Sequence, residues 1–306
     1  MTDPRFWHWL WHIEHEIRPL APMVYYHVWD NFPAPTFNRS FYESTDVIVT
    51  ISKVTDKVVE SVAPNVKRHY IPHIVDEEIF KKYSQEETSH LKSSGLVKEE
   101  NFIDDSGEKK FVFFWNNRNA RRKQSGSLIF WFKDFLDRVG QDKASLIMHT
   151  DVKDVHGQDL EAIISELGMV NGEVMFSTNK YPPAMLAKIY NMADCTINVA
   201  DAEGFGLATF ESLACETPII VTMTGGLQEQ VTDGKNWFGI GIEPSSKAII
   251  GSQDIPWIYE DRLSGKEVVD AMEKMYNMSQ EERDELGRKG RGHVLKNYNF
   301  KKYGEQ

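Results

Sequence analysis

The chain has 306 residues, of which 41% are hydrophobic and 26% are charged, so its composition argues against wholesale disorder and allows two globular domains. The 46 acidic residues outnumber the 35 basic residues, and the resulting net charge of −11 argues against a nucleic-acid partner bound through a general basic surface. We therefore expect any site for a polyanion to be local.

The cysteines and the hydropathy of the sequence indicate where in the cell the protein is expected. Cys195 and Cys215 are expected to be small core residues, as is usual in a reducing cytoplasm. No stretch approaches the roughly 20 apolar residues of a membrane span, and the amino terminus lacks the basic and apolar regions of a signal peptide. We expect a cytoplasmic protein.

The amino-terminal segment, residues 6–16, has the pattern of a helix rich in tryptophan. His8, His12 and His15 share one face of this helix, so they either hold a metal or form the polar face of a docked helix. The tryptophans between them are typical of packing residues, which favours the docked helix.

Three short strands follow at residues 24–27, 47–51 and 68–73, and Ser52 is predicted to cap a helix that ends near residue 62. A doubly wound domain has about six strands. We therefore expect an incomplete first domain. Three explanations are open: the chain is a fragment, another polypeptide supplies the missing strands, or the domain is reduced.

A charged and polar segment at residues 81–109 predicts a linker. It is followed by a predicted strand at residues 111–115 and by a loop, residues 116–123, that is basic in an otherwise acidic protein. In this loop Arg118 can clamp phosphate oxygens with two hydrogen bonds, and Lys123 can add a compact charge. The alternative is a solvated basic loop.

Alternating helices and strands are predicted for the second domain, as in a parallel α/β sheet. Helices are predicted at residues 127–139, 159–167, 183–192, 266–276 and 281–297, and strands at residues 144–149, 174–178 and 219–221. Residues 243–256 are predicted to be an irregular surface excursion.

The central motif lies at residues 196–221, where a β-prone run, a loop with Gly204 and Gly206, a helical pattern and a second β-prone run follow one another. In an open parallel sheet such a loop faces the ligand crevice. The glycines let backbone N–H groups approach a ligand, and the helix that starts near Leu207 aims its positive end there. An anion is the expected guest.

Two carboxylates, Glu203 and Glu211, frame this anion site. Because a carboxylate would repel phosphate, they are better suited to accept hydrogen bonds from the hydroxyl groups of a sugar or a ribose. The combination predicts a sugar nucleotide.

At these residues the chain resembles the family 4 glycosyltransferases, which are retaining enzymes with the two-domain GT-B architecture. The family's pattern Glu-Gly-Phe-Gly, with a second glutamate eight positions after the first, runs here from Glu203 to Glu211. The resemblance continues through residues 214–220 and 225–229, and it can be followed over residues 24–276.

The resemblance implies an α/β fold of two Rossmann-like doubly wound domains, the first of them reduced or truncated. It places a partial acceptor-side domain at residues 1–80, a linker at 81–109, the nucleotide-sugar-binding domain at 110–285 and a helix that returns toward the first domain at 286–306. One departure is Glu216, where the family usually has glycine, so the geometry of that turn is open.

The catalytic residues that the resemblance implies are Glu203, His27, Arg118 and Lys123. Arg118 and Lys123 match the family's diphosphate pair, and Glu203 would bind hydroxyl groups of the donor sugar. His27 matches a histidine that faces the donor sugar, and its alternative role is a hydrogen bond to loop backbone.

The implied donor-binding residues extend this set. Glu211 would bind the ribose, and Tyr181 lies where the family holds the nucleotide base. The remaining members contribute backbone groups and are Gly204, Phe205, Gly206, Leu207, Gly225 and Gly226.

The implied activity is transfer of a sugar from a nucleoside-diphosphate sugar to a hydroxyl acceptor with retention of anomeric configuration and without a metal or other cofactor. The acceptor is a glycan, a lipid-linked molecule or a small molecule, and a lipid acceptor would place the protein at a membrane surface. The alternative is a nucleotide-sugar-binding subunit that needs a partner chain, for example one that completes the first domain. A dinucleotide oxidoreductase is disfavoured, because no Gly-x-Gly-x-x-Gly follows a first strand.

Overall fold

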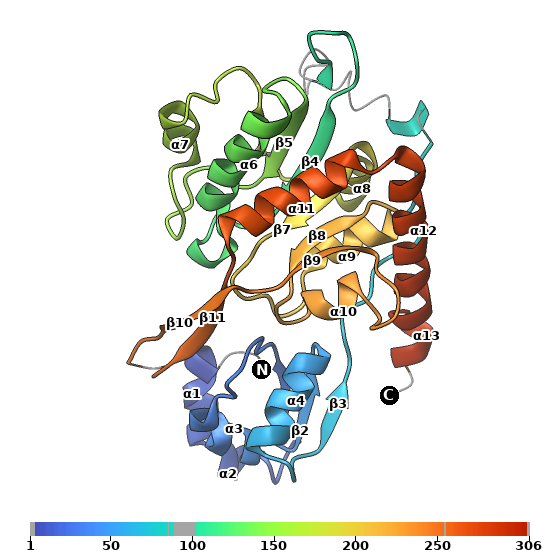
Figure 1. Cartoon of the computed structure of the whole chain (residues 1–306). Helices are drawn as coiled ribbons and strands as arrows, with labels where there is room; N and C mark the ends of the chain where they lie inside the picture. Colours follow the sequence, from blue (N-terminus) through green and yellow to red (C-terminus); the bar gives the residue numbers. More distant parts are fainter. Residues whose placement is uncertain (1–3, 85, 89–101, 254, 305–306) are drawn as a thin grey trace.

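The computed structural model describes residues 4–84, 86–88, 102–253 and 255–304. A small amino-terminal domain and a larger domain lie one below the other in Figure 1, and each is organised around a parallel sheet. The sheets hold three and six strands, which confirms the predicted α/β class with a smaller first domain.

The small sheet contains β1, β2 and β3 in that spatial order, all parallel. These strands span Val24–His27, Val47–Thr50 and Arg68–Tyr70. The helical elements of this domain are α1 (Pro4–His12), α2 (Glu14–Ile17), η1 (Thr36–Asn38), α3 (Arg39–Glu43) and α4 (Lys53–Val62). The three predicted strands are therefore present.

Local hydrogen bonding explains the start of α4. Ser52 has extended backbone, and its side chain accepts a hydrogen bond from the backbone N–H of Thr55 at 3.1 Å. This contact satisfies one of the N–H groups that a helix leaves free at its first turn. The predicted N-cap is confirmed.

The helix predicted at residues 6–16 is divided into α1 and α2, because Ile13 leaves helical geometry with φ −110° and ψ 20°. Trp11 is buried and its ring lies 5.3 Å from that of Tyr25 in β1. Trp9, by contrast, is 58% exposed. Only part of the tryptophan-rich segment packs on the small sheet.

The large sheet has the strand order β6-β5-β4-β7-β8-β9, and every pair of neighbours is parallel. Its strands are β4 (Phe111–Asn116), β5 (Ala144–His149), β6 (Val174–Ser177), β7 (Cys195–Asn198), β8 (Ile219–Thr222) and β9 (Gly239–Ile242). The chain order reverses direction between β4 and β7, so the loops after these two strands diverge and leave a crevice at their carboxyl ends.

Helices cover both faces of the large sheet. One face packs against α6 (Ser125–Val139), α7 (Leu160–Glu166) and α11 (Gly265–Asn277). The other packs against α8 (Pro183–Met192), α9 (Leu207–Ala214), α10 (Leu227–Val231) and α12 (Gln280–Asn297). Two short elements complete the described helices, η3 (Arg121–Lys123) and α13 (Phe300–Tyr303).

A strand occupies part of the segment predicted to be irregular, residues 243–256. Strand β10 (Ser246–Ile250) pairs antiparallel with β11 (Ile258–Arg262) in a hairpin, so the prediction is wrong for residues 246–250. A half-buried strand usually alternates apolar and polar side chains. Ile249 and Ile250 are both apolar, although Ile249 is exposed and Ile250 is partly buried, so the sequence of β10 lacks this alternation.

The turn after α9 carries Glu216 with a φ of +61°, in the left-handed region that favours glycine. Its carbonyl oxygen lies against α12, since a Cβ added to Gly287 would approach it to 2.0 Å. Glu216 therefore adopts the backbone conformation for which glycine is usual.

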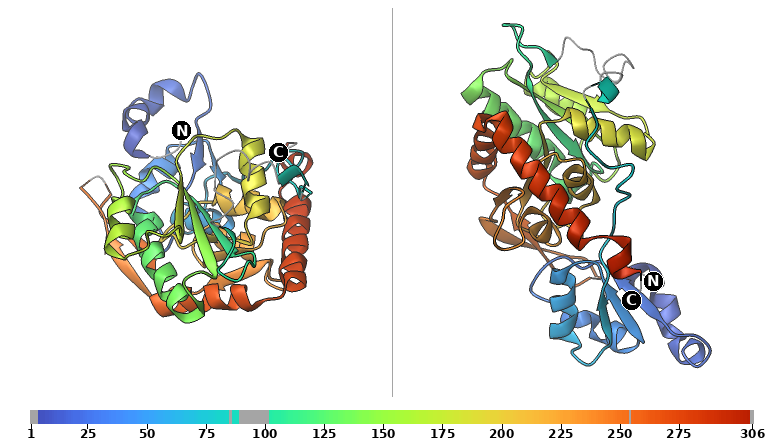
Figure 2. Two further views of the ribbon diagram at one scale, coloured as in Figure 1. Left: turned by 90° about the horizontal axis from the view of Figure 1, so that it is seen from above. Right: turned by 90° about the vertical axis from the view of Figure 1, so that its right-hand side faces the viewer.

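The last helices lead back to the small domain, as the right view in Figure 2 shows. The ring of Tyr303 in α13 lies 5.9 Å from that of Tyr70 in β3. Within the segment predicted as a linker, residues 85 and 89–101 lie outside the described residues.

Glu229 of α10 also joins the two domains. Its carboxylate accepts hydrogen bonds from the backbone N–H of Lys53, at the start of α4, and from the hydroxyl of Tyr70, each at 3.2 Å. The hydroxyl of Tyr298 donates to the Glu229 carbonyl at 3.2 Å. Burial raises the pKa of the Glu229 carboxyl to about 7. This buried acid is the polar centre of the contact between domains.

Replacing Glu229 by alanine removes the acceptor that Lys53 and Tyr70 share. We expect the free energy of unfolding to fall by about 1–3 kcal/mol, because the part-buried donors of Lys53 and Tyr70 lose their acceptor. Urea denaturation at pH 5, below the raised pKa of Glu229, measures the change while the carboxyl of the folded chain is protonated. Glu285→Ala on the exposed side of α12 is the control and should shift stability by no more than about 0.5 kcal/mol. Equal losses in the two variants would contradict the assigned role.

Candidate active site

A cavity of about 1200 Å³ lies between the domains, at the carboxyl ends of β1, β4 and β7. We name residues 117–124, after β4, the basic loop, and residues 199–206, after β7, the glycine loop. Nine predicted site residues line the cavity, namely His27, Arg118, Lys123, Glu203, Gly204, Phe205, Gly206, Leu207 and Glu211.

The basic loop and the glycine loop meet through an ion pair. Lys123 is 6% exposed, and its ammonium donates to the carboxylate of Glu203. Asn198 at the end of β7 lies 3.5 Å from the same carboxylate. Burial disfavours the charged form of Glu203, but Lys123 and Arg122 outweigh it and hold its pKa below the ordinary value. The structure therefore brings two of the predicted residues into direct contact.

Arg122 fixes the backbone of both loops. Its guanidinium donates to the carbonyl of Ala202 at 2.5 Å, and its own carbonyl accepts from the N–H of Asp201 at 2.8 Å. The sequence analysis did not single out Arg122, although it stands in the same basic run as Lys123. Its charge helps to hold the pKa of Glu203 below the ordinary value, and it partly offsets the burial that raises the pKa of Asp30.

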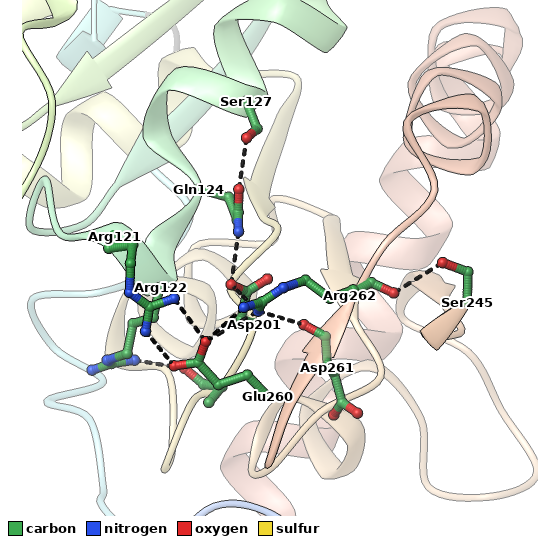
Figure 3. Close-up of polar contacts among 10 residues, drawn as sticks. Arg121, Arg122, Gln124, Ser127, Asp201, Ser245, Glu260, Asp261 and Arg262 are labelled. Carbon is green, nitrogen blue, oxygen red and sulfur yellow. Dashed lines mark hydrogen bonds and ion pairs between the residues drawn. The ribbon is translucent and has the colours of Figure 1, made fainter. Parts of the chain in front are cut away.

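Figure 3 shows a network of carboxylates that holds the basic loop from the side of the hairpin. Glu260 in β11 accepts two hydrogen bonds from Arg121, at 2.8 and 2.7 Å. Arg262 contacts Glu260 at 3.1 Å and Asp201 at 2.5 Å. Gln124 donates to Asp201 at 2.7 Å. The hairpin, the basic loop and the glycine loop are thus tied together by charge-assisted hydrogen bonds.

Arg118 lies at the same cavity but is bonded elsewhere. Its guanidinium makes two hydrogen bonds to Asp154, at 2.6 and 3.1 Å, and its side chain is 60% exposed. Arg118 therefore does not contact Glu203, and an anion in the cavity would compete with Asp154 for this guanidinium.

The glycine loop delivers the start of α9 to the cavity. Gly206 has a φ of +91°, and a Cβ there would approach Leu227 to 2.5 Å, so both conformation and space require glycine. Gly204 is also restricted, because a Cβ would lie 3.0 Å from the carbonyl oxygen of Val28 in the small domain. The amino end of α9, at Leu207, is an electrically positive site for an anion.

Glu211 is held by two residues that the sequence analysis missed. The hydroxyl of Tyr190 donates to its carboxylate at 2.9 Å, and Asn116 at the end of β4 donates to that hydroxyl at 2.9 Å. Burial raises the pKa of Glu211 to about 7, although the bond from Tyr190 acts in the opposite direction. Tyr190 and Asn116 have no local sequence signal, because Tyr190 meets Glu211 where α8 contacts α9 and Asn116 acts through the hydroxyl of Tyr190.

His27 and Asp30 are two residues of the small domain that line the cavity. His27 is 1% exposed at the end of β1, and its Nε2 lies 2.6 Å from the hydroxyl of Tyr42. Burial raises the pKa of Asp30 to about 6, and Arg122 and Lys123 partly offset the effect. A single acid after a strand carries little information in the sequence, so the structure is what brings Asp30 to the site.

Three predicted donor-binding residues lie outside the cavity lining. Tyr181 stacks on His149, with ring centroids 5.5 Å apart. Gly226 donates its N–H to the carbonyl of Glu203 at 3.0 Å, and a Cβ on Gly225 would approach that oxygen to 1.9 Å. The structure thus places the second glycine turn behind the glycine loop, where it supports Glu203.

Neither a metal centre nor a membrane-spanning helix is found in the part of the chain that the structure describes. Within the described ranges, no group of three or more His, Cys, Asp or Glu side chains is arranged to hold a metal ion. None of the helices in that part of the chain combines the length and apolarity needed to cross a bilayer.

The fold places the chain in a known structural class. It superimposes on Anabaena HepE, solved in complex with UDP and glucose, with a TM-score of 0.68 and 16% identity, over 93% of this chain and 70% of that one. Two parallel α/β domains with a cavity between them define the GT-B class.

Residues 98–293, more than half of the chain, match the family described as Glycosyl transferases group 1, and the chain belongs to this family. The family resemblance noted in the sequence is thereby confirmed.

Two curated relatives are similar over different lengths. A D-inositol 3-phosphate glycosyltransferase of Acidothermus cellulolyticus is 38% identical over 25% of this chain, and an N-acetyl-alpha-D-glucosaminyl L-malate synthase of Bacillus anthracis is 23% identical over 79%. The matches cover 17% and 58% of the relatives' own lengths.

The raised pKa of Glu211 predicts a pH-dependent stability. Between the ordinary value of 4.5 and the folded value of about 7, the folded chain binds more protons than the unfolded chain, so stability falls as pH rises. Glu211→Gln removes this loss. We expect the variant to gain stability relative to the parent from pH 4.5 to 7, by an amount on the order of 3 kcal/mol at most.

Urea denaturation across this pH range measures the free energy of unfolding of the variant and of the parent. In the difference between the two free energies, the contributions of the other titrating groups cancel. The control is Glu166→Gln on the exposed face of α7. Its stability difference from the parent should not change with pH, and a flat profile for Glu211→Gln would contradict the assignment.

Proposed function

We propose that the chain is a hexosyltransferase-type glycosyltransferase that moves a sugar from a nucleoside-diphosphate sugar to a hydroxyl acceptor with retention of anomeric configuration. The observation that supports this most strongly is the meeting of Lys123 and Glu203 in one cavity between the domains. A cation suited to a leaving diphosphate and an acid suited to sugar hydroxyl groups are thereby within reach of one molecule.

The electrostatic task of the reaction is to stabilise the departing diphosphate. An ammonium has three N–H donors, so Lys123 can keep one bond to Glu203 and direct another to a phosphate oxygen. The backbone N–H groups at the start of α9 supply further donors, with Arg118 beside them.

The proposed reaction breaks the bond between the anomeric carbon and the diphosphate oxygen while the acceptor oxygen bonds to the same face of the sugar. The leaving phosphate takes the proton of the acceptor hydroxyl, so the chemistry balances without another base. Glu203 holds hydroxyl groups of the donor sugar, Glu211 holds the ribose, and His27 orients the sugar.

Four side-chain cations of the basic loop line the cavity, Arg118, Arg121, Arg122 and Lys123. We therefore propose that transfer needs no divalent metal. The name of each curated relative includes a sugar transfer or synthesis, and the HepE complexes contain UDP, glucose or UDP-glucose, so UDP-glucose is the first donor to test. We place the reaction in the cytoplasm, at a membrane surface if the acceptor is a lipid.

A thermal-shift screen over UDP-, GDP- and ADP-sugars tests the proposal. A ligand that binds only the folded chain raises its melting temperature, and at about 100 times its Kd it adds about 2.7 kcal/mol. We expect one nucleotide series to stabilise the chain and its sugar donor to be slowly hydrolysed. Absence of stabilisation by every nucleotide sugar would overturn the proposal.

The role of Glu211 is tested separately. Glu211→Ala should raise the KM for the donor by about 10–100-fold with a smaller change in kcat, because a hydrogen bond to a charged group contributes about 1.5–3 kcal/mol. Steady-state donor hydrolysis measures both constants. Glu166→Ala, remote on α7, is the control. Unchanged donor kinetics in Glu211→Ala would remove Glu211 from the ribose site.

The three-stranded sheet of the small domain favours one alternative, a nucleotide-sugar-binding subunit that turns over only with a partner chain. This alternative predicts donor binding without hydrolysis, followed by hydrolysis when the partner is added. Hydrolysis by the purified chain alone contradicts it.

A further inference from the structure

The cavity has two chemically different halves. Its arginine and lysine side chains all come from the basic loop, on the side of the large domain. Among the described residues, the small domain contributes neither lysine nor arginine to the lining, and it contributes the aromatic side chains of Trp29, Phe37 and Phe41. We name the part of the lining that Trp29, Phe37 and Phe41 form the apolar half, and the polar side chains of His8, His27, Asn38 and His73 line the cavity beside it.

The hairpin extends this apolar half. Ile250, Ile255 and Ile258 line the cavity, and Ile250 pairs with Ile258 across the hairpin. Because successive side chains of a strand point to opposite faces, Ile249 projects away from the cavity, and it is 67% exposed. β-branched aliphatic side chains offer no hydrogen bonds, so this wall is suited to apolar atoms rather than to sugar hydroxyl groups.

Contacts with the small domain hold the hairpin over the cavity. The ring of Trp257 meets that of Phe37 edge to face, with centroids 4.7 Å apart, and Phe37 meets Trp29 at 5.8 Å. Lys247 donates to the carbonyl of Phe32 at 3.4 Å. The hairpin belongs to the large domain and so closes the apolar half by bridging both domains.

The cavity is also large enough for two molecules. Its volume of about 1200 Å³ exceeds the roughly 300–1,000 Å³ of pockets that hold one drug-sized ligand. A donor bound between the basic loop and Glu211 would leave the half beneath the hairpin for the acceptor.

Charge disfavours an anionic acceptor in this half. The carboxylate that the small domain contributes to the described lining is Asp30, and burial lowers the pKa of His73, so that imidazole is neutral at pH 7. A phosphate or carboxylate placed against Trp29 and Phe37 would be buried on a wall whose described residues include neither lysine nor arginine. A neutral hydroxyl could instead donate a hydrogen bond to Asp30.

We propose that the half formed by Trp29, Phe37 and the hairpin binds the apolar part of an uncharged acceptor, an aliphatic or aromatic group linked to the hydroxyl that receives the sugar. The assignment rests on the proposed function, because it takes the charged half as the donor site. It excludes sugar phosphates and carboxylic acids as preferred acceptors.

Binding of four probes tests the assignment, with and without the nucleotide that stabilises the chain. The probes are octyl β-D-glucoside below its micelle concentration, phenyl β-D-glucoside, glucose and glucose 6-phosphate. Calorimetry should show octyl or phenyl glucoside binding at least tenfold more tightly than glucose, with glucose 6-phosphate weakest. The ratio of octyl to phenyl affinity distinguishes an aliphatic from an aromatic group.

A matched pair of variants locates the binding. Ile250→Asp should weaken binding of the preferred glucoside at least tenfold, whereas Ile249→Asp, on the opposite face of the same strand, should leave it unchanged. Melting temperatures with and without nucleotide report whether each variant folds and keeps the donor site. Equal effects of the two substitutions would overturn the assignment, as would glucose or glucose 6-phosphate binding as tightly as the alkyl and aryl glucosides.

The two proposals fail in different ways. If no nucleotide stabilises the parent chain, the proposed function is refuted, while glucoside binding can still be read directly. If nucleotide binds but the apolar probes show no advantage over glucose, the donor site stands and the acceptor assignment is wrong.

Discussion

The ion pair between Lys123 and Glu203 is the contact on which the arrangement of the cavity depends. It joins the loop after β4 to the loop after β7, the two strands between which the sheet changes direction. A buried ion pair adds little net stability, because removing both charges from water offsets their attraction. Separating the partners is costly, however, since either charge alone would be stranded. The ion pair therefore fixes the position of the two loops relative to each other before any ligand binds.

The same logic extends around the basic loop. Arg121 is held by Glu260, Arg118 by Asp154, and Arg122 by the carbonyl of Ala202. The cations on this one loop would repel one another. These acceptors offset that repulsion and fix the geometry of the loop. A diphosphate must exchange some of these partners for its own oxygens, with little rearrangement of the loop. Preorganised cations of this kind stabilise developing negative charge without reorienting during the reaction.

The small domain is positioned by buried polar contacts as well as by packing. Glu229 binds the start of α4 and the end of β3 from α10, and α13 meets Tyr70 from the carboxyl end of the chain. The hairpin adds a third contact over the cavity. The relative placement of the two halves of the cavity thus depends in part on residues that line neither, and Glu229, an acid whose pKa is about 7, lies at that contact.

Much of the fold was predictable from the sequence alone, because the signals are local. The strand at residues 24–27, the N-cap at Ser52, the helix at residues 183–192 and the β-loop-α-β unit around Glu203 follow from periodicity, capping chemistry and glycine over a few neighbouring residues. The hairpin was missed, since adjacent isoleucines with different surroundings hide the two-residue period.

The sequence by itself determined most of the order of elements, the family, and nine of the residues that line the cavity, because these depend on neighbours in the chain. Only the tertiary structure decided which charges meet. Lys123 bonds Glu203 across 80 positions, Arg121 bonds Glu260 across 139, and Glu229 reaches Lys53 across 176, whereas Arg118 turns to Asp154. Such pairings follow from how loops at the ends of distant strands are brought together, and electrostatic attraction then selects among the partners that packing makes available.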